Sequence, residues 1–192
     1  GDLKDDLAVS ATATTASQSL GRYHAGNVYI FFGDISSGNT RINSADVVIT
    51  GSLPNEQIGK SPAAGDIDND GIDDLVIGAP YSDLGSVRDQ GLTYIMRGRN
   101  TWGSSYDLST DASSRIFGPW PFDQTGRTLA VGDLDGDDHD DIVIGASSGD
   151  GYQRTAKEAG NVYIMLGSYL SENLDGGNLS LRDQYNMTVF GE

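Results

Sequence analysis

The 192 residues carry 28 acidic and 12 basic side chains, a formal charge of −16, and 24 of the acids are aspartate. So acidic a surface disfavours nucleic acid and anionic membranes, because such binding depends on Lys and Arg, and no apolar run approaches the ~20 residues that span a bilayer. There is no cysteine, which excludes disulfides and thiol chemistry, while glycine accounts for 26 residues. Aspartate and glycine favour turns over helices, so the composition predicts a folded, turn-rich, all-β protein.

One pattern occurs three times along the chain. It opens as GDLKDDLAVSA at Gly1–Ala11, and the longer versions GDIDNDGIDDLVIGA and GDLDGDDHDDIVIGA follow at Gly65–Ala79 and Gly132–Ala146. A second motif, AGNVYIFFG, GLTYIMRG or AGNVYIMLG, comes after each copy. A pair of β-branched or aromatic residues then precedes a glycine, at Gly51, Gly118 and Gly191. The chain is therefore predicted to be built from one repeated structural unit.

Each unit is interpreted as four short strands. In the second unit we expect strands at Gly59–Ile67, Asp74–Ala79 and Leu92–Met96, and a fourth that ends near Gly118. Short β-branched and aromatic runs bounded by Gly and Asp favour strands over helices, and the polar stretches 36–44 and 107–114 are expected to be loops. Four strands in a repeat of this length are typical of a β-propeller blade.

The spacing of the repeats predicts nearly three blades, at about residues 1–51, 52–118 and 119–192, with eleven strands in all. The first blade lacks its opening strand. Known propellers close with about four to eight blades, because closure removes exposed strand edges. We therefore expect either a segment of a longer propeller or an association of copies, two of which would give a six-bladed ring.

Two aspartate-rich loops carry the chemical signal. Aspartate occupies loop positions 1, 3, 5 and 9 in both, and carboxylates packed so closely repel one another unless a cation gathers them. Calcium suits this arrangement because it takes six to eight oxygen ligands in flexible geometry. Position 7 would contribute its backbone carbonyl, so its side chain is free to vary. The predicted ligands of two calcium ions are Asp66, Asp68, Asp70, Ile72 and Asp74, and Asp133, Asp135, Asp137, His139 and Asp141.

Other interpretations of these loops fit less well. An EF-hand would need Glu at position 12, where Ile77 and Ile144 stand, and a helix rather than a β-type run afterwards. Solvated turn aspartates would not explain two copies with identical spacing. Asp73 and Asp140, at position 8, are expected to face solvent, and Asp138 is expected to tolerate the left-handed turn that Gly71 makes in the first loop.

The opening copy departs from this pattern. Asp2 and Asp6 align with Asp66 and Asp74, but four residues between them are missing. We therefore predict that the opening copy binds no calcium and that Lys4 supplies positive charge in its place.

The loop motif, the GAP element at Gly78-Ala79-Pro80 and the GxVY motif together resemble the FG-GAP repeat of integrin α-subunit propellers and their prokaryotic relatives. Ile58-Gly59 and Thr125-Gly126 stand where that family has Phe-Gly. The resemblance covers nearly the whole chain. It implies a calcium-stabilised β-propeller of an extracellular or cell-surface protein, commonly used in adhesion, with the eight loop aspartates as calcium ligands. No motif marks an integrin-like ligand site.

Catalysis is disfavoured, because calcium holds carboxylates ionised whereas general acid catalysis needs a raised pKa. His24 and His139 have no nucleophile motif nearby. The prediction is a non-enzymatic adhesion or protein-interaction scaffold whose partners are other blades and a protein or glycan ligand. The alternatives are an accessory propeller of a larger secreted enzyme, or a carbohydrate-binding propeller whose loops present Trp102, Trp120, Tyr81, Tyr106 and Tyr152. Asn178 and Asn186 fit the glycosylation sequon.

Overall fold

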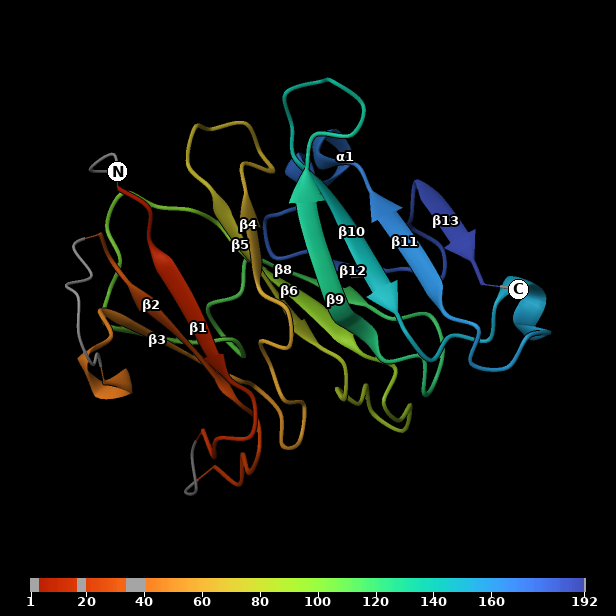
Figure 1. The fold of residues 1–192 in the computed structure, drawn as a ribbon, viewed down its shortest axis with the longest axis horizontal. Coiled ribbons are helices and arrows are strands. Elements are labelled where there is room, and N and C mark those ends of the chain that lie inside the picture. The colour runs from red at the N-terminus through yellow and green to blue at the C-terminus, as the bar shows by residue number, and fades with distance from the viewer. Residues whose placement is uncertain (1–3, 17–19, 34–40, 192) are drawn as a thin grey trace.

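Figure 1 shows the computed structural model, which describes residues 4–16, 20–33 and 41–191. Three sheets follow one another along the chain, and we call them the first, second and third blades. The first blade contains, in order, β1 (Leu7–Ala11), β2 (Asn27–Phe31), β3 (Val47–Thr50) and β7 (Ser105–Asp107). The second contains β4 (Ala63–Gly65), β5 (Asp74–Ala79), β6 (Leu92–Met96), β8 (Ser114–Phe117) and β12 (Asn178–Ser180). The third contains β9 (Thr125–Gly132), β10 (Asp141–Ala146), β11 (Asn161–Met165) and β13 (Met187–Phe190).

Helical structure is scarce in the described part of the chain. It comprises α1 (Gly167–Ser171) and two 3-10 turns, at Ile42–Ser44 and Tyr152–Arg154. None of these is long and apolar enough to cross a membrane. The all-β prediction, with sheets that resemble propeller blades, is confirmed.

Successive residues of the middle strands supply two different cores, as the two-residue period of a strand requires. Ile77 of β5 belongs to the core shared with the first blade, where it is buried with Val28 and Ile49. Val76, its neighbour in β5, belongs to the core shared with the third blade, which includes Ile142. All six residues of β5 are buried, because the strand lies between two other blades.

Glycine is required where the second and third blades meet. A Cβ atom at Gly78 of β5 would collide with the carbonyl oxygen of Gly126 in β9. Gly126 itself has φ +82°, in the left-handed region that glycine adopts without strain. The Gly-Ala and Thr-Gly motifs of the sequence are therefore contact points between neighbouring blades.

The described residues form two more strands than the eleven predicted. β7 pairs in parallel with β3, and β12 pairs in parallel with β8, so each adds a strand from one repeat to the outer edge of the preceding blade. The start of the predicted loop at 107–114 thus belongs to a strand, which its three residues were too few to reveal. Of the predicted loop at 36–44, residues 36–40 lie outside the described residues.

Among the described residues, no strand pairs with β1 on the side where the repeat predicts an opening strand. β4 pairs with β5 and β9 with β10, but β1, which corresponds to β5 and β10 in the repeat, lies at the edge of its sheet. Elsewhere the predicted strands are found, although the first strand of the second unit is shorter than expected and covers only Ala63–Gly65.

Candidate metal centres

The two acidic loops lie at the same end of their blades (Figure 1), one between β4 and β5 and the other between β9 and β10. Each loop is folded by its own first aspartate. Asp66 accepts hydrogen bonds from the amides of Asp70 and Gly71, both at 2.9 Å. Asp133 accepts them from Gly136 at 2.7 Å and Asp138 at 3.2 Å.

The fifth and sixth loop positions also match. Oδ1 of Asp70 accepts the amide of Ile72 at 2.9 Å, and Oδ1 of Asp137 accepts that of His139 at 3.0 Å. Asp138 has φ +67°, which confirms that it takes the left-handed conformation of Gly71, at φ +84°. The two loops therefore have the same backbone turn despite their different sequences.

Three carboxylates gather in each loop, with oxygens within 4.8 Å of one another. In the first loop these are Asp66, Asp68 and Asp70, and in the second they are Asp133, Asp135 and Asp141. The structure thus brings together six of the eight predicted carboxylate ligands. Asp74 and Asp137 fall outside these close groups.

Asp68 is held in an unusual environment. Its side chain is only 10% exposed, and its Oδ1 is buried without a hydrogen-bond partner in the described part of the chain. Nε of Arg97 lies 3.2 Å from the other oxygen, Oδ2. Burial and the negative charge of Asp70 raise the pKa of Asp68, while Arg97 opposes this rise. No motif in the sequence marked Arg97, whose counterpart in the third repeat is Leu166.

The carboxylates of the second loop differ in their surroundings. Desolvation and the charges of Asp137 and Asp141 raise the pKa of Asp135. The amide of His139 holds the pKa of Asp137 below its usual value, with help from Ser168. The carboxylates of Asp137 and Asp141 therefore repel that of Asp135.

The position-9 aspartates are buried and hold each loop to its blade. Asp74 accepts the amides of Gly98 at 2.7 Å and Ile67 at 3.3 Å, and burial raises its pKa to about 6. Asp141 accepts those of Gly167 and Leu134, both at 2.9 Å.

The residues at loop position 7, Ile72 and His139, make different contacts in the two loops. The carbonyl oxygen of Ile72 lies against Gly98, where an added Cβ would sit 2.7 Å from it. The ring of His139 instead reaches the second blade, where Nδ1 lies 3.0 Å from the carbonyl oxygen of Ile67.

The expectation that both position-8 aspartates face solvent is wrong for Asp140. Its carboxylate accepts the amide of Asp66 at 2.9 Å, and its own amide donates to the carbonyl of Asp66. Asp140 therefore joins the loop of the third blade to that of the second, a contact that only the packing of blades creates. Asp73 is exposed, as predicted.

The opening copy keeps one feature of the loops. Asp6 accepts the amide of Gly33 at 2.9 Å, as Asp74 does from Gly98. Lys4 lies nearby, lining a cavity with Asp6. Asp2 lies outside the described residues, so the prediction that this copy binds no calcium stays a prediction.

The family model of the FG-GAP repeat matches residues 59–96 and 125–165, which include both loops. The chain carries FG-GAP repeats. It is 33% identical over 132 residues to phosphatidylinositol-glycan-specific phospholipase D of Bos taurus, 66% of this chain and 15% of that protein. It is 36% identical over 138 residues to integrin alpha-PS2 of Drosophila melanogaster, 67% of this chain and 9% of that protein. To integrin alpha-V of Gallus gallus it is 32% identical over 111 residues, 57% of this chain and 10% of that protein. The matched FG-GAP segment is thus a small part of each relative.

Proposed function

We propose that residues 66–74 and 133–141 each bind one calcium ion with a structural role. Oδ1 of Asp68 carries this proposal, because it is buried without a hydrogen-bond partner among the described residues and lies beside the oxygens of Asp66 and Asp70. Buried polar atoms are nearly always satisfied, and clustered carboxylates are ligands that calcium prefers. Two ions would reduce the formal charge of the chain from −16 to −12, because −16 + 4 = −12.

Each proposed ligand set combines the clustered carboxylates with the other predicted positions of its loop. The first set is Asp66, Asp68, Asp70, Asp74 and the carbonyl of Ile72, and the second is Asp133, Asp135, Asp137, Asp141 and the carbonyl of His139. Both loops connect an inner strand to the next strand of the blade. Bound calcium would therefore fix this connection and offset the repulsion among the carboxylates.

On this scaffold we infer a non-enzymatic adhesion or protein-interaction role outside the cell or at its surface. The integrin relatives support this inference. The accessory propeller of a larger secreted enzyme is the second candidate, because other relatives bear the name of a phospholipase D. A phospholipase assay of the 192-residue chain distinguishes a scaffold from a catalytic unit, and turnover by this chain would contradict the non-enzymatic role.

The surroundings of Trp102 and Trp120 give less support to carbohydrate binding than the relatives give to a scaffold. The guanidinium groups of Arg154 and Arg182 lie 5.1 and 4.3 Å from the ring centre of Trp120. That of Arg99 lies 4.9 Å from the ring centre of Trp102. Cation–π contacts of this kind occupy the ring faces on which a sugar would stack.

Calcium titration by calorimetry tests the metal proposal. We expect two ions per wild-type chain, one for Asp70→Asn, one for Asp137→Asn and none for the double variant. Asparagine retains an oxygen for the amide of Ile72 or His139, so the loop turn survives while the charge is lost. Asp5→Asn, an exposed acid of the opening copy, is the matched control and should leave both ions bound.

Thermal unfolding provides a second measurement. A chelator should lower the melting temperature of the wild-type chain, because an ion that binds only the folded state stabilises it. The double variant should melt at the same temperature with or without calcium. A wild-type melting curve that does not respond to calcium would contradict the structural role.

A further inference from the structure

Residues 139 and 140 of the second acidic loop contact the start of the first. Oδ2 of Asp140 accepts the amide of Asp66 at 2.9 Å, and the amide of Asp140 donates to the carbonyl oxygen of Asp66, also at 2.9 Å. Nδ1 of His139 lies 3.0 Å from the carbonyl oxygen of Ile67. Because a carbonyl oxygen only accepts, Nδ1 carries the hydrogen of this bond. Three hydrogen bonds therefore join the two loops.

These bonds connect the proposed ligands of one calcium ion to those of the other. We call residues 66–74 the first site and residues 133–141 the second site. Asp66 is the first carboxylate of the first site, and Asp140 stands between two proposed ligands of the second, the carbonyl of His139 and the carboxylate of Asp141. The side chains of His139 and Asp140 are not ligands themselves. An ion at the second site would therefore fix the backbone on both sides of Asp140 and, through it, Asp66.

The position of Asp66 matters for the rest of the first site. Asp66 folds its own loop by accepting the amides of Asp70 and Gly71. The contact with Asp140 is also close, because a Cβ atom at Gly65 would collide with the carboxylate of Asp140. A shift of residues 139 and 140 would therefore move the first ligand of the neighbouring site and the loop folded around it.

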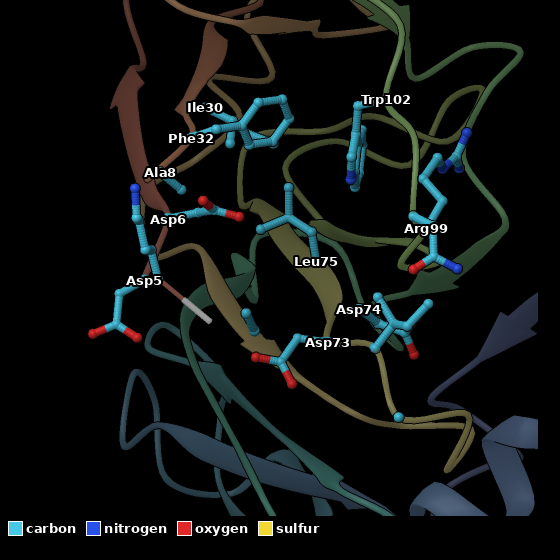
Figure 2. Close-up of a pocket in the computed structure, with 15 residues that line it drawn as sticks. Asp5, Asp6, Ala8, Ile30, Phe32, Asp73, Asp74, Leu75, Arg99 and Trp102 are labelled. Atoms are coloured by element: carbon cyan, nitrogen blue, oxygen red, sulfur yellow. The ribbon is translucent and has the colours of Figure 1, made fainter. Parts of the chain in front are cut away.

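Asp73, at position 8 of the first loop, has different surroundings from Asp140. It is exposed and lines the same cavity as Asp6, between the first and second blades (Figure 2). Asp73 and Asp140 thus share a residue type and a loop position, whereas Asp140 holds the loop of the neighbouring blade. Asp73 is therefore a matched control for Asp140.

We propose that the two calcium sites are coupled through Asp140 and His139, so that calcium at the second site raises the affinity of the first. The coupling rests on the proposed function, because it requires both ions to bind. Calcium at the first site must then raise the affinity of the second by the same factor. Repulsion between the two ions acts in the opposite direction, and salt at about 150 mM screens it over distances beyond ~8 Å. The sign of the coupling therefore separates the hydrogen bonds from charge repulsion.

Calcium titration followed by amide NMR at this salt concentration tests the coupling. The amide of Ile72 reports on the first site and that of His139 on the second, because each donates to an aspartate of its loop. We define the coupling ratio as the affinity of the first site in a chain with both sites divided by that in the same chain carrying Asp137→Asn. We expect a ratio of at least about five in the wild-type background.

Variants of the two linking side chains should change this ratio. In the double variant His139→Ala/Asp140→Ala it should fall below about two, with both sites still binding calcium. Asp140→Asn loses the charge but keeps an oxygen for the amide of Asp66, so the ratio should persist. Asp73→Ala, the matched control, should also leave the ratio unchanged.

Hydrogen exchange provides a second readout that does not depend on an ion in the first site. In Asp70→Asn only the second site should bind calcium, and we expect calcium to slow exchange of the Asp66 amide at least several-fold. In Asp70→Asn/Asp140→Ala, calcium should leave that exchange rate nearly unchanged. Equal exchange with and without calcium in Asp70→Asn would contradict the coupling.

Three titration results would overturn the coupling while leaving the two calcium sites in place. One is a wild-type ratio near one, and another is a ratio below one, which repulsion alone would give. The third is a ratio that persists in His139→Ala/Asp140→Ala. A wild-type chain that takes up no calcium would instead contradict the coupling and the proposed function together.

Discussion

Asp6, Asp74 and Asp141 each accept the amide of the glycine that follows the next strand of their blade: Gly33, Gly98 and Gly167. The opening copy has lost four loop residues but retains this hydrogen bond. At the residue scale, the position-9 aspartate therefore has a structural task that does not depend on a cation. In the first loop the other three aspartates face one another, whereas in the second loop Asp141 itself joins the group of Asp133 and Asp135. The two candidate sites differ in this respect.

Arg97 makes the first site weaker than the second in our interpretation. Its guanidinium stands beside Asp68, while the corresponding residue of the third repeat is Leu166. A nearby positive charge repels a divalent cation, so Arg97→Leu should raise the calcium affinity of the first site about tenfold. Leu166→Arg should lower that of the second. Calorimetry with the other site removed by Asp137→Asn or Asp70→Asn measures each effect, and equal affinities in Arg97→Leu and wild type would contradict it.

The buried carboxyl of Asp123, which lies outside the metal loops, should make the unfolding free energy depend on pH. Burial raises its pKa to about 6 from 3.8, although Arg154, 3.4 Å away, opposes the rise. The folded state thus holds this proton more tightly than the unfolded state. Stability from this group is present below about pH 4 and is lost as the pH rises through 6, by up to about 3 kcal/mol.

Asp123→Asn should therefore flatten the decline in unfolding free energy between pH 4 and 7 in chelator. Urea unfolding at several pH values measures this slope. Asp5→Asn, at an exposed position of the opening copy, is the control and should leave the slope in place. An unchanged slope in Asp123→Asn would contradict the assignment.

At the element scale, β7 and β12 tie neighbouring blades together. Each is a three-residue strand that runs parallel to the outer strand of the preceding blade. A buried leucine follows each strand: the amide of Leu108 donates to the carbonyl of Thr50, and that of Leu181 to that of Phe117, both at 3.0 Å. Strands so short depend on such anchors, because three ladder residues alone stabilise little.

Leu108→Ala and Leu181→Ala should each lower the unfolding free energy by about 2–4 kcal/mol, the usual cost of a cavity at a buried leucine. Urea denaturation measures the change. Thr110→Ala, at an exposed position after β7, should have almost no effect. A loss below 1 kcal/mol in both leucine variants would mean that these strands contribute little to the joining of blades.

At the scale of the whole molecule, the first and third blades end the row of three blades, and each exposes apolar residues on its edge strand. The first blade exposes Leu7 and Val9, at 44% and 39%, and its β1 is an edge strand among the described residues. The third blade exposes Met187 and Val189, at 52% and 54%, on β13. In the described part of the chain, no strand pairs in parallel with β13 as β7 and β12 do with the outer strands of the other blades. Association through these ends would bring the first blade of one copy against the third blade of another. Such head-to-tail contacts form a closed ring only when the rotation that relates one copy to the next returns to the starting copy.

The molar mass in solution should therefore show no discrete dimer. Light scattering of the calcium-loaded chain should give 20.3 kDa at low concentration, with a mass that grows as concentration rises. A stable species near 40.6 kDa, twice the chain mass, would instead support a closed ring of two copies. It would contradict the prediction that the chain is a segment of a longer propeller.

The strands, the repeat and the acidic loops could be predicted from the sequence because each is a local pattern. Short runs of β-branched and aromatic residues mark β2, β5, β10 and β11. The spacing of aspartates within nine residues fixes the loop turns wherever the blades lie. What tertiary structure decided joins residues far apart in the chain. The pairing of β7 with β3, the bond from Asp140 to Asp66, and Arg97 beside Asp68 have no local signal. They arise only when packing of the blades brings these segments into contact.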